Sequence, residues 1–168
     1  MWTSPIPEGE NLADVGRRAQ ALIDKLIATN ATIAQPGPPL LPDDTVRKLV
    51  ELALKNMQGA LCGDRKPCSP ATPEEFQTPP VSIEHARTIV MTAARTAFAD
   101  WCGLDWQRRS FLPMMRHYRH TLRFTERQMA LVALLHGIQQ GMLSEQLKAK
   151  GACEAATRAG IEAQLPRM

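Results

Sequence analysis

Two pairs of residues have the type and spacing to bind a metal ion. Cys62 and Cys68 enclose the turn-forming sequence "GDRKP", and His117 and His120 lie three positions apart in a basic stretch. Histidines at this spacing share one face of a helix, so both can reach one ion. Paired cysteines of zinc sites, however, are usually separated by roughly two to four residues. The wider gap and the lack of a second cysteine pair lead us to expect no bound metal and no cofactor.

The same side chains could in principle serve thiol catalysis. A thiolate at Cys62 or Cys68 would be favoured by the adjacent Arg65 and Lys66, and Cys68 or Cys102 could be paired with His117 only by assumption. The sequence contains no G-x-S-x-G, no H-E-x-x-H and no glycine-rich phosphate loop. We therefore predict no catalytic residues, and a metal- or thiol-dependent enzyme is the second alternative function.

The stretch from Met115 to Met129 carries the densest positive charge, with four arginines and two histidines. On a helix, four of these residues share one face at relative positions i, i+3, i+4 and i+7. Two further arginines lie just upstream and can join the same surface. The candidate partner-binding residues are Arg108, Arg109, Arg116, Arg119, His120 and Arg123. Such a face either is simply solvated or binds an acidic protein, nucleic acid or an anionic membrane, because guanidinium groups pair well with carboxylates and phosphates.

A helix boundary is predicted inside this stretch. Thr125 and Gln128 have the spacing of a capping box, and Phe124 and Met129 occupy the hydrophobic positions that flank such a cap. A new helix should therefore begin at Thr125, which turns Arg127 away from the upstream arginines.

Small residues recur every four positions along the helix that follows, at Ala133, Gly137 and Gly141. Glycine inside a helix costs about 1 kcal/mol relative to alanine, so a compensating contact is expected. We predict that another helix approaches this strip, either within the chain or at an interface with a second molecule. A homodimer is one form of that interface.

The last quarter of the chain resembles the helix-turn-helix of LuxR-type regulators. Phe124–Arg127, Leu134-Leu135, Gly137 and Glu145–Leu147 match its opening Leu-Thr-x-Arg pattern, apolar helix, glycine and scaffold helix. The resemblance implies DNA binding. The spacing departs by one residue before Leu147 and again at Lys148–Lys150, and the would-be reading helix offers few side chains for base edges.

The elements that must position these residues all have helical periodicity. Apolar spacing predicts helices near 12–27, 43–61, 82–102, 110–124, 125–151 and 153–165, with Asp43, Ser82, Ser110 and Thr125 as caps. A flexible N-terminus (1–10), a Pro-rich linker (31–42) and a Cys/Pro-rich loop (62–81) separate them, and Thr72 in "TPEEF" has capping-box spacing. We therefore predict an all-α, bundle-like single domain of about six helices over residues 1–168.

Composition places the chain among ordinary globular proteins. Hydrophobic residues are 44%, charged residues 22% and the net charge is +3, which permits an acidic partner without requiring one. The longest apolar run, "MALVALL", is too short to span a bilayer, and the N-terminus lacks a secretory pattern. We therefore expect a soluble cytoplasmic protein whose four cysteines (Cys62, Cys68, Cys102 and Cys153) are free thiols rather than a disulfide framework, with a disulfide as the alternative for the pair Cys62 and Cys68.

The favoured function is a non-enzymatic protein-binding module, such as an adaptor, accessory subunit or chaperone-like protein. It would bind an acidic protein through the arginine-rich face and through apolar surfaces rich in methionine, which adapts its shape to different partners. A DNA-binding regulator is the first alternative.

Overall fold

The computed structural model describes Arg17, Ala21 and residues 41–166. Three features predicted from the sequence lie wholly or mainly outside these residues: the N-terminus 1–10, the helix near 12–27 and the Pro-rich linker 31–42.

Six α-helices and no β-strand occur within residues 41–166, so the predicted all-α class is confirmed. The helices are α2 (Asp43–Lys55), α3 (Pro73–Gln77), α4 (Ile83–Trp101), α5 (Leu112–Arg116), α6 (Glu126–Lys150) and α7 (Ala155–Gln164). Two 3₁₀ turns, η1 (Met57–Gly59) and η2 (Gly63–Arg65), follow α2. Two π-helical turns, η3 (Gln107–Phe111) and η4 (His117–Thr121), flank α5 and extend it into one continuous helical stretch.

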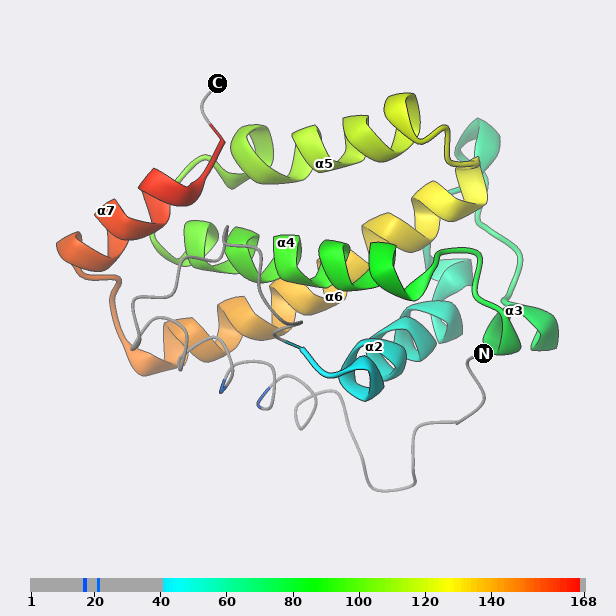
Figure 1. Cartoon of the computed structure of the whole chain (residues 1–168), viewed down its shortest axis with the longest axis horizontal. Coiled ribbons are helices and arrows are strands. Elements are labelled where there is room, and N and C mark those ends of the chain that lie inside the picture. Colours follow the sequence, from blue (N-terminus) through cyan, green and yellow to red (C-terminus); the bar gives the residue numbers. More distant parts are fainter. Residues whose placement is uncertain (1–16, 18–20, 22–40, 167–168) are drawn as a thin grey trace.

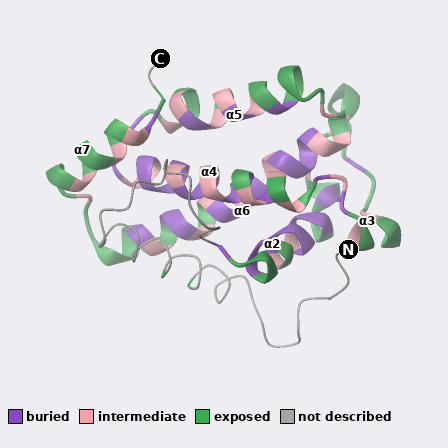
Figure 2. Cartoon of the chain, viewed as in Figure 1, coloured by how far each residue is buried: buried purple, intermediate pink, exposed green. Residues whose placement is uncertain are grey.

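The two longest helices, α4 and α6, pack against each other over most of their lengths (Figure 1). Helix α2 packs against both, whereas α5 with its π turns runs along another side of the pair and α7 covers the end of α4. Buried residues concentrate on α2, α4 and α6, and α7 is mostly exposed (Figure 2). The basic residues on η3, α5 and η4 are therefore held by a scaffold built mainly by α4 and α6.

The core follows the helical periodicity of the sequence. The predicted apolar stripe of α4 is buried from Ala86 to Phe98 and faces leucines and valines of α2 and α6. A main cluster fills the space among these three helices, and two smaller clusters lie where α4 and α6 meet and where α7 joins. Burying large aliphatic side chains stabilises such an interface by about 1.5–3 kcal/mol each.

Local capping signals are confirmed at the starts of three helices. Thr72 begins α3 and Thr125 begins α6, each with both hydrogen bonds of a capping box, and the Ser82 hydroxyl accepts from the His85 backbone N–H at the start of α4. The predicted cap at Asp43 was wrong, because Asp43 is the first residue inside α2 and the cap position is Pro42, which makes no side-chain hydrogen bond. Gly151 ends α6, as predicted, with a φ of 125° that favours glycine.

Replacing Thr125 with alanine is expected to lower the free energy of unfolding by about 1 kcal/mol. The Thr125 hydroxyl accepts a 3.1 Å hydrogen bond from the Gln128 N–H, and the Gln128 side chain accepts a 2.8 Å bond from the Thr125 N–H. Urea denaturation measures the change, and Thr121→Ala, at an exposed threonine of η4, is the control. Equal losses in the two variants would show that the cap contributes nothing.

The helix that contains the basic residues begins earlier than predicted. Ser110 does not cap it but lies buried inside η3, and the helical stretch starts at Gln107. The Ser110 hydroxyl instead lies 2.6 Å from that of Thr96 on α4. A serine at the start of an apolar run was misread as a cap because its real partner is distant in the sequence.

All four cysteines form disulfides, so the prediction of free thiols was wrong. Cys62 pairs with Cys68 across the turn at η2, and Cys102, just after α4, pairs with Cys153, just before α7. The prediction depended on a cytoplasmic location, where thiols are kept reduced.

Candidate functional site

The six predicted partner-binding residues lie along the helical stretch η3–α5–η4 and its end, but they differ in what they contact. Arg109 donates hydrogen bonds to the backbone carbonyls of Glu162 and Pro166 and lies 3.4 Å from the Glu162 carboxylate. Arg119 donates a 2.6 Å hydrogen bond to Glu126 at the start of α6. These two arginines are engaged within the chain, so they stabilise the junctions of α5 with α7 and α6.

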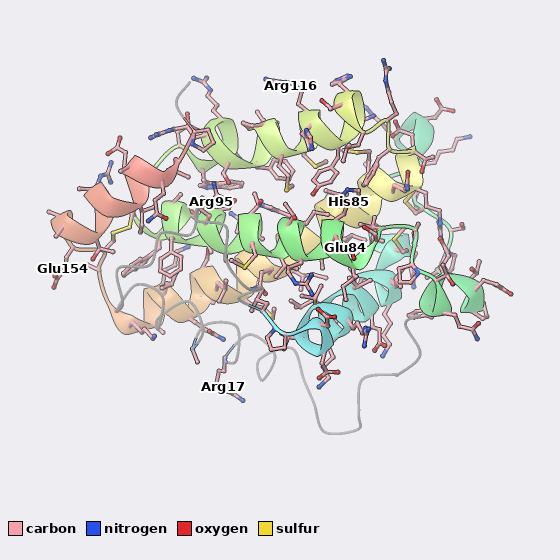
Figure 3. All side chains as sticks on the ribbon, viewed as in Figure 1. Arg17, Glu84, His85, Arg95, Arg116 and Glu154 are labelled. Carbon is pink, nitrogen blue, oxygen red and sulfur yellow. A yellow bond between two sulfur atoms is a disulfide. The ribbon has the colours of Figure 1, made fainter. Side chains whose placement is uncertain are left out.

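The remaining basic residues are exposed and make fewer contacts with the rest of the described chain. Arg108 is 72% exposed and its guanidinium lies 3.8 Å from the carboxylate of Asp105. Arg116, His120 and Arg123 are exposed and make no ion pair or side-chain hydrogen bond with the described residues. Arg116 projects from the outer side of α5 (Figure 3). We call Arg116, His120 and Arg123 the basic ridge.

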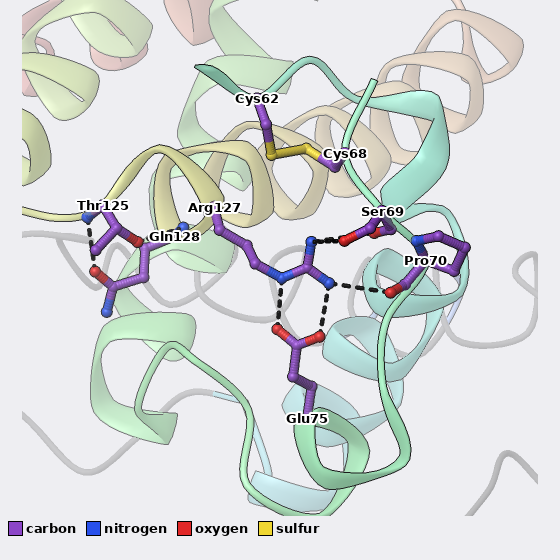
Figure 4. Close-up of a disulfide and its surroundings, with 8 residues drawn as sticks. All are labelled: Cys62, Cys68, Ser69, Pro70, Glu75, Thr125, Arg127 and Gln128. Carbon is purple, nitrogen blue, oxygen red and sulfur yellow. Dashed lines mark hydrogen bonds and ion pairs between the residues drawn. A yellow bond between two sulfur atoms is a disulfide. The ribbon is translucent and has the colours of Figure 1, made fainter. Parts of the chain in front are cut away.

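Arg127 points away from the basic ridge, as the helix boundary at Thr125 predicted. It forms two hydrogen bonds with the Glu75 carboxylate of α3, at 2.6 and 2.7 Å, and it also donates to the backbone carbonyls of Ser69 and Pro70 (Figure 4). These bonds hold the Cys/Pro-rich loop against the start of α6. The hydrogen bond from Arg127 is the main cause that lowers the pKa of Glu75 below its ordinary value.

The two glycines of the small-residue strip on α6 do not pack against another described helix. Gly137 and Gly141 are exposed, and a Cβ atom added at either position would meet no described atom within 4 Å. Close packing between helices within residues 41–166 is therefore not what these glycines serve. Their role at an interface with another molecule stays a prediction.

Gly137 and Ala133 instead form the floor of an apolar groove. Two hollows, of about 410 and 510 Å³, lie on either side and share these two residues. The first is lined by Trp106, Gln107, Phe111, Leu112, His136 and Gln140, and the second by Ala60, Leu61, Ala130, Leu134 and Ile138. We call the two hollows together the α6 groove. Gly137 keeps the groove open at its floor because it has no side chain.

Two leucines on the rim of the α6 groove are largely exposed. Leu61 is 60% and Leu112 is 47% exposed, and they are among three exposed large hydrophobic residues in the described chain, Leu122 being the third. The predicted methionine-rich surface is absent here, since none of the six methionines between residues 41 and 166 is exposed. Leucine, alanine and aromatic side chains provide the apolar surface instead.

The candidate metal ligands are not brought together. Cys62 and Cys68 are bonded to each other in the structure, and His117 and His120 lie on η4, away from any third ligand. Within the described residues, no three His, Cys, Asp or Glu side chains are arranged to hold a metal ion. The hypothetical thiol dyads are also excluded, because Cys68 and Cys102 are both in disulfides.

A buried polar cluster joins α4, η3 and α6 and was missed in the sequence. The Thr96 hydroxyl lies 2.6 Å from that of Ser110 and 3.0 Å from Nε2 of His136. Burial lowers the pKa of His136 to about 4, so this imidazole is neutral at physiological pH. The two contacts of Thr96 join residues that are 14 and 40 positions apart, which no local spacing in the sequence reveals.

Within the described residues, no helix combines the length and apolar character needed to cross a membrane. The unbroken course of α6 through Gly137 and Gly141 also differs from a helix-turn-helix, in which the chain would turn between two shorter helices. No protein-family model matches the chain, and comparisons with curated proteins and with solved structures found no match. Its function is therefore inferred from its own surfaces.

Proposed function

We propose that the protein is a non-enzymatic binding module that docks an acidic amphipathic helix of another protein on α5 and α6. The observation that carries this proposal is the α6 groove, whose rim continues into the basic ridge. Leu112 lies one helical turn before Arg116, so the apolar and basic surfaces follow each other on α5.

The groove has the chemistry of a helix-binding surface. Its hollows are lined mainly by apolar side chains, and it lies along a helix that presents glycine rather than a bulky residue at its centre. Amphipathic helices commonly bind such grooves through apolar residues at positions i, i+3 or i+4, and i+7. Exposed leucines on both sides would be removed from water by the same contact, which favours association.

The basic ridge selects the charge of the partner. Arg116, His120 and Arg123 lack intramolecular acidic partners among the described residues, whereas Arg109 and Arg119 have them. A partner with carboxylates beside its apolar face would satisfy these groups. Charges at the rim of an interface act mainly on specificity and on the rate of association.

The test uses a synthetic peptide that forms a helix with leucine on one face and glutamate on the other. Fluorescence anisotropy should detect its binding to the full chain, and a peptide with lysine in place of glutamate should bind far more weakly. Gly137→Leu should abolish binding by filling the groove while leaving the melting temperature unchanged or higher, because an open glycine within a helix is replaced.

The charge contribution is tested by Arg116→Glu together with Arg123→Glu. We expect roughly tenfold weaker binding of the acidic peptide and an unchanged helical circular dichroism spectrum. Arg65→Glu with Lys66→Glu reverses two exposed charges in the disulfide loop and is the matched control. Equal binding of both peptides, or no effect of Gly137→Leu, would contradict the proposal.

Concentration-dependent self-association that Gly137→Leu abolishes would instead assign the groove to a homodimer.

The location proposed for this function differs from the cytoplasm expected from the sequence. Two disulfides persist more readily in the periplasm, the secretory pathway or outside the cell than in a reducing cytoplasm. We therefore propose an oxidising compartment. Thiol alkylation of the protein as it is isolated from its native cell, read by mass spectrometry, should find the four cysteines protected.

A further inference from the structure

A second recess lies between α4 and the antiparallel stretch η3–α5–η4. Its volume is about 350 Å³, within the range of small-molecule sites. The α4 side is a polar stripe at helical spacing, formed by His85, Thr88, Thr92 and Arg95. The opposite side is formed by Ser110, Pro113, Met114, His117 and Tyr118, and Pro166 closes one end. We call this recess the α4–α5 cleft.

Arg95 is the unusual residue of the cleft. Its side chain is partly buried, its Nε atom is shielded from solvent without a hydrogen-bond acceptor, and it forms no ion pair with the described residues. No aspartate or glutamate is among the residues that line the cleft. Shielding Nε from solvent without an acceptor is unfavourable, so an anion that enters the cleft and accepts from this guanidinium would be bound favourably.

The other polar side chains of the cleft carry no negative charge: they are the hydroxyls of threonine, serine and tyrosine and the imidazoles of two histidines. The Ser110 hydroxyl is held by Thr96, which also contacts His136. At the other end, the His85 ring packs edge-on against Tyr118 at 5.7 Å, and His117 packs against the same tyrosine at 5.4 Å. Burial raises the pKa of Tyr118 to about 12, so its hydroxyl stays protonated and can donate.

The cleft is elongated, with different groups at its two ends. Arg95 follows His85 by ten residues on α4, which corresponds to about 15 Å along the helix axis. Figure 3 places both residues on the side of α4 that faces α5, with Arg95 toward α7 and His85 toward the beginning of α4. An occupant would therefore meet a guanidinium at one end and two imidazoles beside a phenol at the other.

We propose that the α4–α5 cleft binds a small, elongated organic oxyanion whose acid group, a carboxylate or a phosphate, pairs with Arg95. The planar guanidinium offers two parallel N–H donors to either group, and the hydroxyls of Thr92 and Ser110 lie along the ligand's path. The site is independent of the α6 groove, because the two use different faces of α5 and share no lining residue.

The test is isothermal titration calorimetry of the full chain with inorganic phosphate, acetate, succinate and adipate, each at matched ionic strength in chloride. The structure predicts saturable binding of phosphate or of a dicarboxylate, with the longer dicarboxylates binding more tightly than acetate. Comparing the affinity for phosphate with that for the dicarboxylates shows whether the cleft prefers a phosphate or a carboxylate group.

Variants locate the binding. Arg95→Met should weaken it by about tenfold or more, because a charge-assisted pair is lost, and Arg95→Lys should retain part of it as a point charge. Arg95→Met should leave the melting temperature without ligand unchanged or higher, since it removes a partly buried guanidinium whose Nε has no acceptor. Arg108→Met, at an exposed arginine of η3, should leave binding unchanged. Thr92→Val tests the cleft without changing the charge and should weaken binding several-fold.

Three results would overturn the proposal. Absence of binding of every probe to the unmodified protein would show that the cleft is not an oxyanion site. Binding unaffected by both Arg95→Met and Thr92→Val would place the anion elsewhere. Loss of the folded state in Arg95→Met, together with unchanged binding in Thr92→Val, would show that Arg95 is a structural residue.

Discussion

Replacing Cys102 and Cys153 together with alanine is expected to lower the free energy of unfolding by about 4 kcal/mol. The two residues are 51 positions apart in the sequence, and their disulfide closes a loop that contains η3, α5, η4 and the whole of α6. Without the bond, the unfolded chain gains the conformational freedom of that loop, and the loss of stability grows with loop length.

The effect should be felt most at α7. This helix has no buried residue of its own, and it is held by contacts near the disulfide. Trp101 donates a 2.8 Å hydrogen bond to the Gly151 carbonyl, and Arg158 donates to the carbonyl of Cys102. Hydrogen exchange should therefore quicken in α7 well before it changes in α4 and α6.

Urea denaturation of the alanine double variant measures the predicted loss. Cys62→Ala with Cys68→Ala is the matched control, because its disulfide spans only six positions and should contribute about 2 kcal/mol. Equal losses for the two double variants would contradict the loop-length argument. A thiol assay of the unfolded, unreduced protein should find no free thiol in the unmodified chain.

The disulfides also mark the limit of what the sequence could predict. Whether Cys102 meets Cys153 depends on how α4 and α7 come together, and neither residue has a local signal for its partner. The caps at Thr72, Ser82 and Thr125 were predictable because each uses side-chain and backbone groups within three residues. Ser110 shows the converse, since a similar local pattern was overridden by a hydrogen bond to Thr96 on another helix.

The candidate surfaces also combine features that local spacing predicts with features that depend on contacts distant in the sequence. Helical spacing placed Arg116, His120 and Arg123 together, but only the folded chain shows that Arg109 binds α7 and that Arg119 binds Glu126. The polar residues from His85 to Arg95 also recur at helical spacing, on another side of α4 from its apolar stripe. Their significance depends on α5 covering them, which turns an ordinary exposed face into a cleft that contains an unpaired arginine.

Replacing Arg127 with methionine is expected to lower the free energy of unfolding by about 3 kcal/mol, the second largest effect that we predict. The arginine joins α6 to α3 and to the loop after Cys68 through paired bonds to Glu75 and bonds to the carbonyls of Ser69 and Pro70. Methionine keeps the length and removes all of these donors. Both side chains of the ion pair are mostly shielded from solvent, so the loss exceeds that of an exposed pair.

The contribution of this pair should also depend on pH. The hydrogen bond from Arg127 lowers the pKa of Glu75 from its ordinary value of 4.5. The unfolded chain therefore binds a proton at higher pH than the folded chain does. The stabilisation is complete above that ordinary value and is lost as the pH falls through the lower pKa of the folded state. Below about pH 4.5, the stability difference between the unmodified protein and Arg127→Met should shrink.

Urea denaturation across the acid range measures this convergence. Glu75→Gln should reproduce most of the loss at neutral pH and remove its pH dependence, whereas Glu74→Gln, at the exposed neighbour on α3, should do neither. A gap between the unmodified protein and Arg127→Met that stays constant down to pH values well below 4.5 would show that the Glu75 carboxylate is not the group that Arg127 stabilises. In that case the bonds to Ser69 and Pro70 alone would hold the loop on α6, and the stability would be insensitive to the charge of Glu75.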